Sequence, residues 1–320
     1  MPAERPDPAV DVVCLGILVA DAVARPVDAL PPRGSLGLVG ELTLQAGGCA
    51  LSTASALTRL GLRASVVGKV GADAFGDFLV ARLDERGVDR GSLVRDASSP
   101  TSASVVLVDG EGERTFLHQP GANGALRAEE VDGEALFAGR ALHVGGALVM
   151  PELDGEPTAL LLAEARRRGL ATSLDTAFDP TGRWDRVLPC LPHLDLVTPG
   201  LAEARGISGH DDPGAAAAWL RARGARAVVV TMGPDGCYAA GRGFEGRVPG
   251  IPVAAIDGTG SGDAFAAGLI YGTLAGWPLE RAARFANAVG ALSTTAVGAV
   301  AGLRDVPETL VLAGLETPRS

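Results

Sequence analysis

The chain has 320 residues, of which 47% are hydrophobic and only 4% aromatic. That length fits one α/β domain with a smaller attached element, and that apolar content excludes global disorder. The formal charge of −10 repels phosphate backbones and anionic lipid, so we expect neither a nucleic-acid nor a membrane partner.

The cysteines and the N-terminus indicate where the protein resides. Cys14, Cys49, Cys190 and Cys237 show no paired spacing, which is typical of free thiols in a reducing cytosol. The N-terminal segment is rich in proline and acidic residues and lacks the basic start of a signal peptide. No apolar run reaches the roughly 18 residues of a membrane span. We therefore expect a cytoplasmic protein.

The first third of the chain predicts strands and helices in alternation. Short apolar or alternating runs predict strands. One predicted helix begins at the double glycine at 47 and a second one ends before Gly87, and a glycine closes each of them. The expected elements are strands at 10–18, 41–45 and 64–67 and helices at 47–60 and 73–86.

The next segment reads as a hairpin, and the remainder alternates again. Two β-like runs flank Asp109-Gly110-Glu111-Gly112, which is a hairpin signal. Strands that alternate with helices of ten to fifteen residues imply parallel βαβ units. The expected elements are strands at 102–108, 114–117, 140–145, 171–174, 195–198 and 225–231, and helices at 128–137, 156–168, 212–223, 264–274 and 282–294.

The predicted fold is therefore α/β, with a doubly wound, mainly parallel sheet flanked by helices. Two β-rich pieces, 18–44 and 98–121, do not fit the alternation. We expect them to form a small β-sheet lid beside a core made of 1–17, 45–97 and 122–320. A plain edge extension of the main sheet is the alternative.

The strongest chemical signal is the turn Gly258-Thr259-Gly260-Ser261-Gly262, which leads into Asp263 and an apolar helix. Glycines let bare N–H groups approach a ligand, and a helix N-terminus favours an anion. Asp263 is either a helix cap or a base that deprotonates an attacking hydroxyl. With the N–H groups of Gly260, Ser261 and Gly262 holding a phosphoryl group, the pattern predicts a kinase centre.

Other phosphate-binding patterns do not occur. Gly68-Lys69 is followed by Val70, where a Walker motif requires Ser or Thr. A dinucleotide-binding turn belongs in the first βαβ unit, whereas this turn lies in the last quarter of the chain. No protein-kinase catalytic-loop signature is present.

Several ordered blocks resemble the ribokinase-like (PfkB) family of carbohydrate kinases over nearly the whole chain. The segment 257–265 resembles its C-terminal signature, and 47–61 its N-terminal one. Further matches are Gly68-Lys69-Val70-Gly71, Gly112-Glu113-Arg114 and Gly121-Ala122-Asn123. The resemblance implies a Rossmann-like core with a β lid, ATP and Mg²⁺ as cofactors, and phosphorylation of a primary alcohol on a sugar.

The resemblance also implies roles for individual residues. Asp263 would be the catalytic base, and Glu203 would organise Mg²⁺ through water. Asp257 and Thr259 are candidates for a monovalent-cation (K⁺) site, as in some family members. The implied ATP contacts are Thr231, Gly233, Gly236 and Asn287, and the implied sugar contacts are Asp21, Gly47, Gly48 and Ser52.

The chain departs from the family's pattern mainly on the substrate side. Ser52 and Gly200 stand where the family has asparagine, and Gly258 stands where threonine is usual. Cys49 and Val19 replace a lysine and an asparagine of ribokinase proper. A site lacking these polar groups would not hold ribose in the same way.

The substrate and the partners therefore stay open at this stage. A nucleoside kinase and a ligand-binding protein that has lost turnover are the alternatives to a sugar kinase. The resemblance also allows a homodimer formed through the lid. His118 falls on a predicted lid strand and could touch substrate, with an ordinary surface histidine as the alternative.

Overall fold

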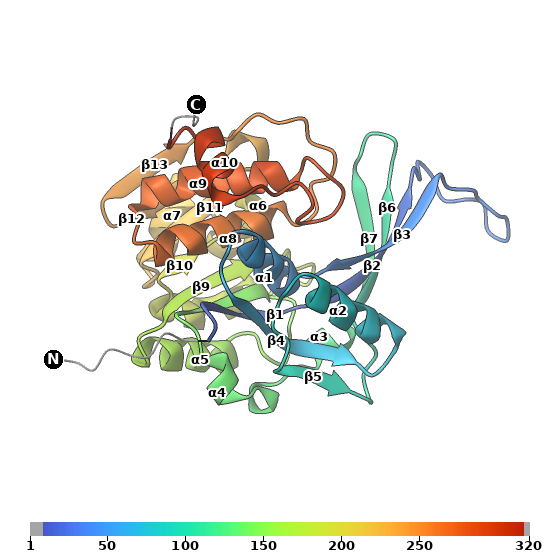
Figure 1. The fold of residues 1–320 in the computed structure, drawn as a ribbon, viewed down its shortest axis with the longest axis horizontal. Helices are drawn as coiled ribbons and strands as arrows, with labels where there is room; N and C mark the ends of the chain where they lie inside the picture. The colour runs from blue at the N-terminus through green and yellow to red at the C-terminus, as the bar shows by residue number, and fades with distance from the viewer. Residues whose placement is uncertain (1–8, 317–320) are drawn as a thin grey trace.

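A computed structural model describes residues 9–316, and its centre is a nine-stranded sheet (Figure 1). Its strand order is β13-β12-β11-β10-β9-β8-β1-β4-β5, parallel except for β12 and β13 at one edge. The strands are β1 (Val12–Gly16), β4 (Ala64–Gly71), β5 (Leu93–Asp96), β8 (Ala141–Ala147), β9 (Ala171–Thr176), β10 (Leu196–Val197), β11 (Ala227–Thr231), β12 (Cys237–Gly241) and β13 (Phe244–Val248).

Helices cover both faces of this sheet, because alternate residues of its buried strands face opposite layers. Val12 and Cys14 pack with α1, α8 and α9, whereas Val13 and Leu15 pack with α5 and α7. The α-helices are α1 (Cys49–Arg59), α2 (Ala74–Glu85), α3 (Gly121–Gly124), α4 (Gly133–Leu136), α5 (Glu156–Arg167), α6 (Leu201–Ser208), α7 (Pro213–Arg221), α8 (Ser261–Leu274), α9 (Leu279–Ser293) and α10 (Val306–Leu312). Three 3₁₀ segments are η1 (Ala128–Glu130), η2 (Trp184–His193) and η3 (Gly233–Asp235). The predicted α/β fold is confirmed.

A second, small sheet projects from the main body (Figure 1). Its order is β3-β2-β6-β7, with β2 and β6 parallel and the other pairs antiparallel. The strands are β2 (Val19–Arg25), β3 (Glu41–Gly47), β6 (Ala103–Val108) and β7 (Arg114–Gln119). The two β-rich pieces of the sequence thus form one separate sheet rather than an extension of the main one. The division of the chain into core and lid domains stays a prediction.

Glycines pack the joint between the two sheets. A Cβ on Gly16, at the end of β1, would lie 1.9 Å from the carbonyl oxygen of Gly145. Gly48 has a φ of 91°, and a Cβ there would lie 2.5 Å from the carbonyl oxygen of Ile17. The backbones therefore touch where the chain passes from β1 into β2 and from β3 into α1.

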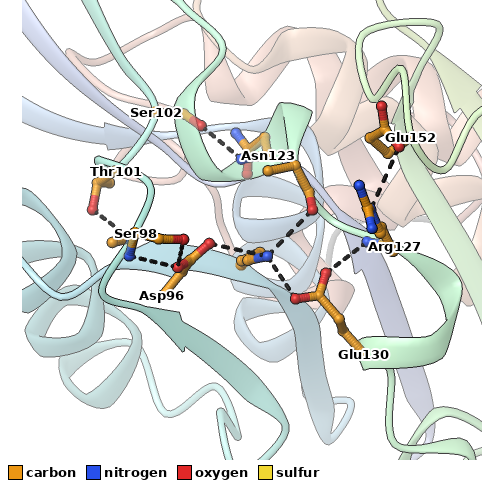
Figure 2. Close-up of polar contacts among 11 residues, drawn as sticks. Asp96, Ser98, Thr101, Ser102, Asn123, Arg127, Glu130 and Glu152 are labelled. Carbon is orange, nitrogen blue, oxygen red and sulfur yellow. Dashed lines mark hydrogen bonds and ion pairs between the residues drawn. The ribbon is translucent and has the colours of Figure 1, made fainter.

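An ion-pair cluster around the buried Lys69 includes Asp96 and Glu130 (Figure 2). The Lys69 ammonium is 3.0 Å from Asp96, 2.6 Å from Glu130 and 3.2 Å from the Ala125 carbonyl oxygen. Burial alone would lower the pKa of Lys69, but the two carboxylates outweigh burial and raise it. The cluster fastens β4, β5 and η1 to one another.

Beside this cluster, Asn123 ties the small sheet to the main body (Figure 2). Its side chain accepts a hydrogen bond from the Leu18 N–H (3.1 Å) and donates to the Leu18 carbonyl (2.8 Å). Its own N–H donates to the Ser102 hydroxyl (3.0 Å). Three segments that cross between the sheets therefore meet at one residue, Asn123.

One predicted helix was wrong. Residues 128–137 form η1 and α4 instead of one helix, because Val131 is extended and the Asp132 carboxylate caps a new start by accepting from Glu134 N–H. The strand expected at 195–198 shortens to β10. All four cysteines are free, as expected. In the described part of the chain, no helix has the length and apolar character needed to cross a bilayer.

Candidate active site

The glycine-rich turn runs directly into α8, three residues earlier than expected. Gly260 has a φ of 73°, and a Cβ there would lie 2.4 Å from the Ala299 Cβ, so glycine is required. Asp263 falls in the first turn of α8, where N–H groups lack intrahelical partners. A Cβ on Gly262 would meet no atom within 4 Å, so this position faces open space. The Ser261 N–H donates to the Gly258 carbonyl oxygen at 3.3 Å, and Gly262 is exposed, so the turn places backbone donors beside a carboxylate.

Asp263 is held by α1 rather than by its own helix. The Cys49 thiol and the Ser52 hydroxyl hydrogen-bond to its carboxylate, and the Thr53 hydroxyl donates to its carbonyl oxygen at 3.3 Å. Burial and nearby carboxylates raise the pKa of Cys49 well above its usual value, so the thiol stays protonated and can donate. Ser52, expected to contact sugar, thus lies against the predicted base.

Asp175, which the sequence analysis missed, lies next to this base. It is the penultimate residue of β9, is 7% exposed, and its side-chain oxygen lies within 4.8 Å of both the Cys49 sulfur and an Asp263 oxygen. Burial, followed by repulsion from Asp263 and Glu203, raises the pKa of Asp175 well above its usual value. Burial is also the main cause of the raised pKa of Asp263, with a smaller contribution from Glu203.

Glu203 completes this group, which we call the carboxylate cluster (Asp175, Glu203 and Asp263). Its Oε2 accepts from the Gly200 N–H and from the Thr176 hydroxyl, both at 2.7 Å. Burial raises the pKa of Glu203, and these two hydrogen bonds oppose the shift. No ion pair reaches the cluster from any residue that the structure describes. Three carboxylates without a cation form a site that a divalent cation would stabilise.

A cavity of about 550 Å³ opens on the other side of the glycine turn. All four predicted nucleotide contacts line it, together with Gly258, Ser261 and Gly262; they are Thr231, Gly233, Gly236 and Asn287. The Asn287 amide donates to the carbonyls of Val248 (3.1 Å) and Pro249 (2.9 Å), so it shapes the wall after β13. Ile251, Val253 and Ala291 give the wall apolar surfaces suited to a flat ring.

The other predicted sugar contacts lie on the small sheet and where it joins α1. Asp21 faces a cleft between the small sheet and residues 256–259. A Cβ on Gly47 would lie 2.3 Å from an Asp21 oxygen, so Gly47 lets this carboxylate pack against β3. Gly48 follows at the start of α1. Burial raises the pKa of Asp21 to about 6, although a hydrogen bond from Ser104 opposes the shift.

Arg114 of β7 bridges the small sheet and the glycine turn, and the sequence analysis gave it no role. Its guanidinium donates to the Thr259 hydroxyl and lies 3.8 Å from an Asp257 oxygen. Asp257 also accepts from the Thr259 N–H (2.9 Å), the Thr259 hydroxyl (2.6 Å) and the Gly298 N–H (2.9 Å). The carboxylate expected at a K⁺ site is therefore engaged by protein donors. The Gly112-Glu113-Arg114 block was the signal that could have identified Arg114.

Comparison with known proteins identifies the family. Residues 9–305 match the pfkB family of carbohydrate kinases. The chain is 36% identical over 301 residues to a fructokinase of Klebsiella pneumoniae, covering 89% of this chain and 95% of that protein. It is 31% identical over 284 residues to fructokinase-1 of Zea mays, covering 83% and 87%.

Solved structures agree with this result. A fructokinase with bound ATP from Xylella fastidiosa superposes with a TM-score of 0.78 at 26% identity, covering 95% of this chain and 98% of that one. The fold also matches an Arabidopsis thaliana ribokinase complexed with ribose and ATP, with a TM-score of 0.81 at 24% identity, covering 95% and 99%. The chain belongs to the pfkB family, and it is a carbohydrate kinase.

Proposed function

We propose that the protein transfers the γ-phosphoryl group of ATP, in line, to a primary hydroxyl of a sugar. The observation that carries this proposal is Gly258, which lines both the 550 Å³ cavity and the cleft under the small sheet. A nucleotide in the cavity and a sugar in the cleft would meet at the turn before Asp263. ATP is bound by the related Xylella fastidiosa fructokinase, which supports the same donor here.

Asp263 is the proposed base. Its raised pKa makes it a better proton acceptor than an ordinary carboxylate, and Cys49 and Ser52 fix its orientation. Because phosphoryl transfer is largely dissociative, it takes the hydroxyl proton late. The N–H groups of Gly260, Ser261 and Gly262 stabilise the charge on the transferring group.

Arg114 is the proposed cation on the sugar side of the turn. Its planar guanidinium can exchange the Thr259 hydroxyl for phosphoryl oxygens, with which it forms stronger, paired hydrogen bonds. Because β7 carries it, this contact forms only when the small sheet lies over the site. The small sheet would then also exclude water.

Mg²⁺ fits the carboxylate cluster, since it prefers oxygen ligands and the three carboxylates lack a cation. Glu203, through water, and Asp175 are the residues that would hold it, and Mg²⁺ would neutralise charge on the ATP phosphates. A K⁺ site at Asp257 and Thr259 remains part of the proposal. Unchanged turnover when K⁺ is replaced by a large organic cation would contradict the K⁺ site.

The sugars to test first are fructose and related ketoses, because the Klebsiella pneumoniae and Zea mays relatives are fructokinases. The experiment measures ADP release from MgATP with a panel of ketoses, aldoses and nucleosides. Turnover on a sugar supports the proposal. Turnover on nucleosides alone would make the protein a nucleoside kinase, and ATP binding without turnover would make it a ligand-binding protein.

The small sheet also supports a homodimer. Its face away from the cleft exposes Leu42 (69%), Leu44 (41%), Val105 (44%) and Leu117 (61%), on three strands. Such a continuous apolar face is typical of an interface. Light scattering should give twice the chain mass, and Leu42→Glu with Leu117→Glu should give the monomer mass. A monomeric unaltered protein would contradict this assembly.

A further inference from the structure

A row of polar side chains crosses the small sheet from edge to edge. Gln45 pairs with Asp21, Asp21 with Ser104, and Ser104 with His118. Because residues paired in register share one face of a sheet, all four lie on the face that carries Asp21. The row therefore extends from the proposed sugar contact to the opposite edge of the sheet.

The neighbouring rows on the same face differ in character. The next one, two residues along each strand, is mainly apolar: Thr43, Val23, Val106 and Phe116. The row after it includes Arg114, which contacts the glycine turn. Several of these side chains line the cleft with Asp21, which establishes that this face looks toward the catalytic turn. Within the polar row, Asp21 and Gln45 line this cleft, and Ser104 and His118 continue the row beyond it on the same face.

The hydrogen bonds along the row have a definite direction. The Ser104 hydroxyl hydrogen-bonds to the Asp21 carboxylate and also lies 3.0 Å from His118 Nδ1. A serine has a single hydrogen to donate, and an ionised carboxylate only accepts. Ser104 therefore donates to Asp21, and His118 Nδ1 must donate to Ser104. A neutral imidazole with its proton on Nδ1 keeps a lone pair on Nε2.

We infer that His118 is a specificity-determining residue whose Nε2 accepts a hydrogen bond from a sugar hydroxyl, while Asp21 accepts from another hydroxyl of the same sugar. The inference rests on the proposed sugar kinase function. The inferred substrate is a neutral polyol with one hydroxyl donor facing His118 Nε2 and another facing the Asp21 carboxylate. A deoxy, fluoro or methoxy group opposite Nε2 would leave that acceptor without a donor.

Two substitutions of His118 separate the two ring nitrogens. His118→Asn keeps an N–H group near the Nδ1 position and removes the acceptor at Nε2. His118→Gln reaches the Nε2 position with an amide oxygen and gives up the Nδ1 bond. With the best sugar of the panel, we expect His118→Asn to raise KM for the sugar about tenfold, the value of one hydrogen bond, and His118→Gln to raise it less. The turnover number and KM for ATP should stay within about twofold.

Monodeoxy sugars identify the hydroxyl that contacts His118. For one of them, the unaltered protein and His118→Asn should show the same KM, because the contact is already absent. His210→Asn is the matched control, since His210 is an exposed histidine outside the small sheet, and it should behave like the unaltered protein. Melting curves confirm that the variants are folded.

The outcomes separate the role of His118 from the proposed sugar kinase activity. Sugar turnover by the unaltered protein, with KM unchanged in folded His118→Asn for every sugar, contradicts the role of His118 alone. Equal losses in His118→Asn for all deoxy sugars also contradict it. No turnover on any sugar by the unaltered protein contradicts the proposed function, and the inference with it.

Discussion

Two groups of charged side chains in this protein have opposite electrostatics. At Lys69, one ammonium meets two carboxylates and a carbonyl oxygen, and it joins three segments. In the carboxylate cluster, burial is the first cause of the raised pKa values of Asp175 and Asp263, and repulsion from neighbouring carboxylates adds to it. The paired group stabilises the fold, whereas the unpaired group weakens it and is suited to bind a cation and a proton. Burial of charge alone therefore does not distinguish structure from function, but its pairing does.

The largest expected effect follows from removing the proposed base. Asp263→Asn should lower turnover by about 10²–10⁴-fold, because the amide cannot accept the hydroxyl proton, and ATP affinity should stay nearly unchanged. ADP release and calorimetric ATP titration measure the two quantities. Asp212→Asn is the control, since Asp212 only caps α7. Near-normal turnover of Asp263→Asn would contradict the role of Asp263 as the base.

Removing the cation from the paired group should act on stability instead. Lys69→Met leaves Asp96 and Glu130 facing each other without a counter-charge, and we expect the melting temperature to fall by about 5 °C or more. Turnover of the folded protein should be retained. Arg90→Met, which breaks an exposed pair with Asp84, should shift the melting temperature by about 1 °C or less. Equal shifts in the two variants would contradict the contrast between paired and exposed charge.

Neutralising one member of the unpaired group should raise the melting temperature, whereas Lys69→Met should lower it. Because the folded-state pKa of Asp175 is raised, its contribution to stability is fully present below the usual carboxyl pKa of about 4 and is lost as pH rises through the folded value. Asp175→Asn should therefore melt a few degrees above the unaltered protein near pH 8. The gap should close toward pH 4. A gap that is constant or widest at low pH would contradict this account.

The smallest effect is expected at Gly258. A Cβ there would lie 3.3 Å from an Arg114 nitrogen, so Gly258→Thr should displace the guanidinium from Thr259. We expect KM for the sugar to rise about threefold, corresponding to a weakened hydrogen bond, with an unchanged melting temperature. Gly133→Thr, on a surface with open space around it, is the control. An unchanged KM for the sugar would contradict an influence of Arg114 on sugar binding.

Local sequence signals predicted most of the fold. The helices before Gly61 and Gly87 were recognisable because each glycine adopts a positive φ just after the helix ends. The helix expected at 128–137 failed because Val131, Asp132 and Gly133 interrupt two stretches of helix-forming residues, and Asp132 caps the second stretch. The β12–β13 hairpin was missed as well, since its two strands are short and antiparallel, whereas the elements predicted before them alternate between strand and helix.

The residues of the candidate site could be predicted from the sequence only in part. Asp263 could be found because glycines surround it, and Asp21 because a family block contains it. Asp175 lies near the end of an ordinary buried strand, and the carboxylates that raise its pKa lie 28 and 88 residues further along the chain. Only the fold, which brings the end of β9 close to the first turns of α6 and α8, reveals that repulsion. Likewise, the Ser104–His118 contact exists only through the register of β6 and β7.

The glycine joint between the sheets has a consequence for how this gene can vary. Every single-base missense change in a glycine codon introduces a residue with a Cβ, of which alanine is the smallest. At Gly16 and Gly48 even that atom would overlap a backbone oxygen. In a random mutant library selected for activity, these two codons should stay glycine, whereas the exposed loop between β2 and β3 should accumulate substitutions freely.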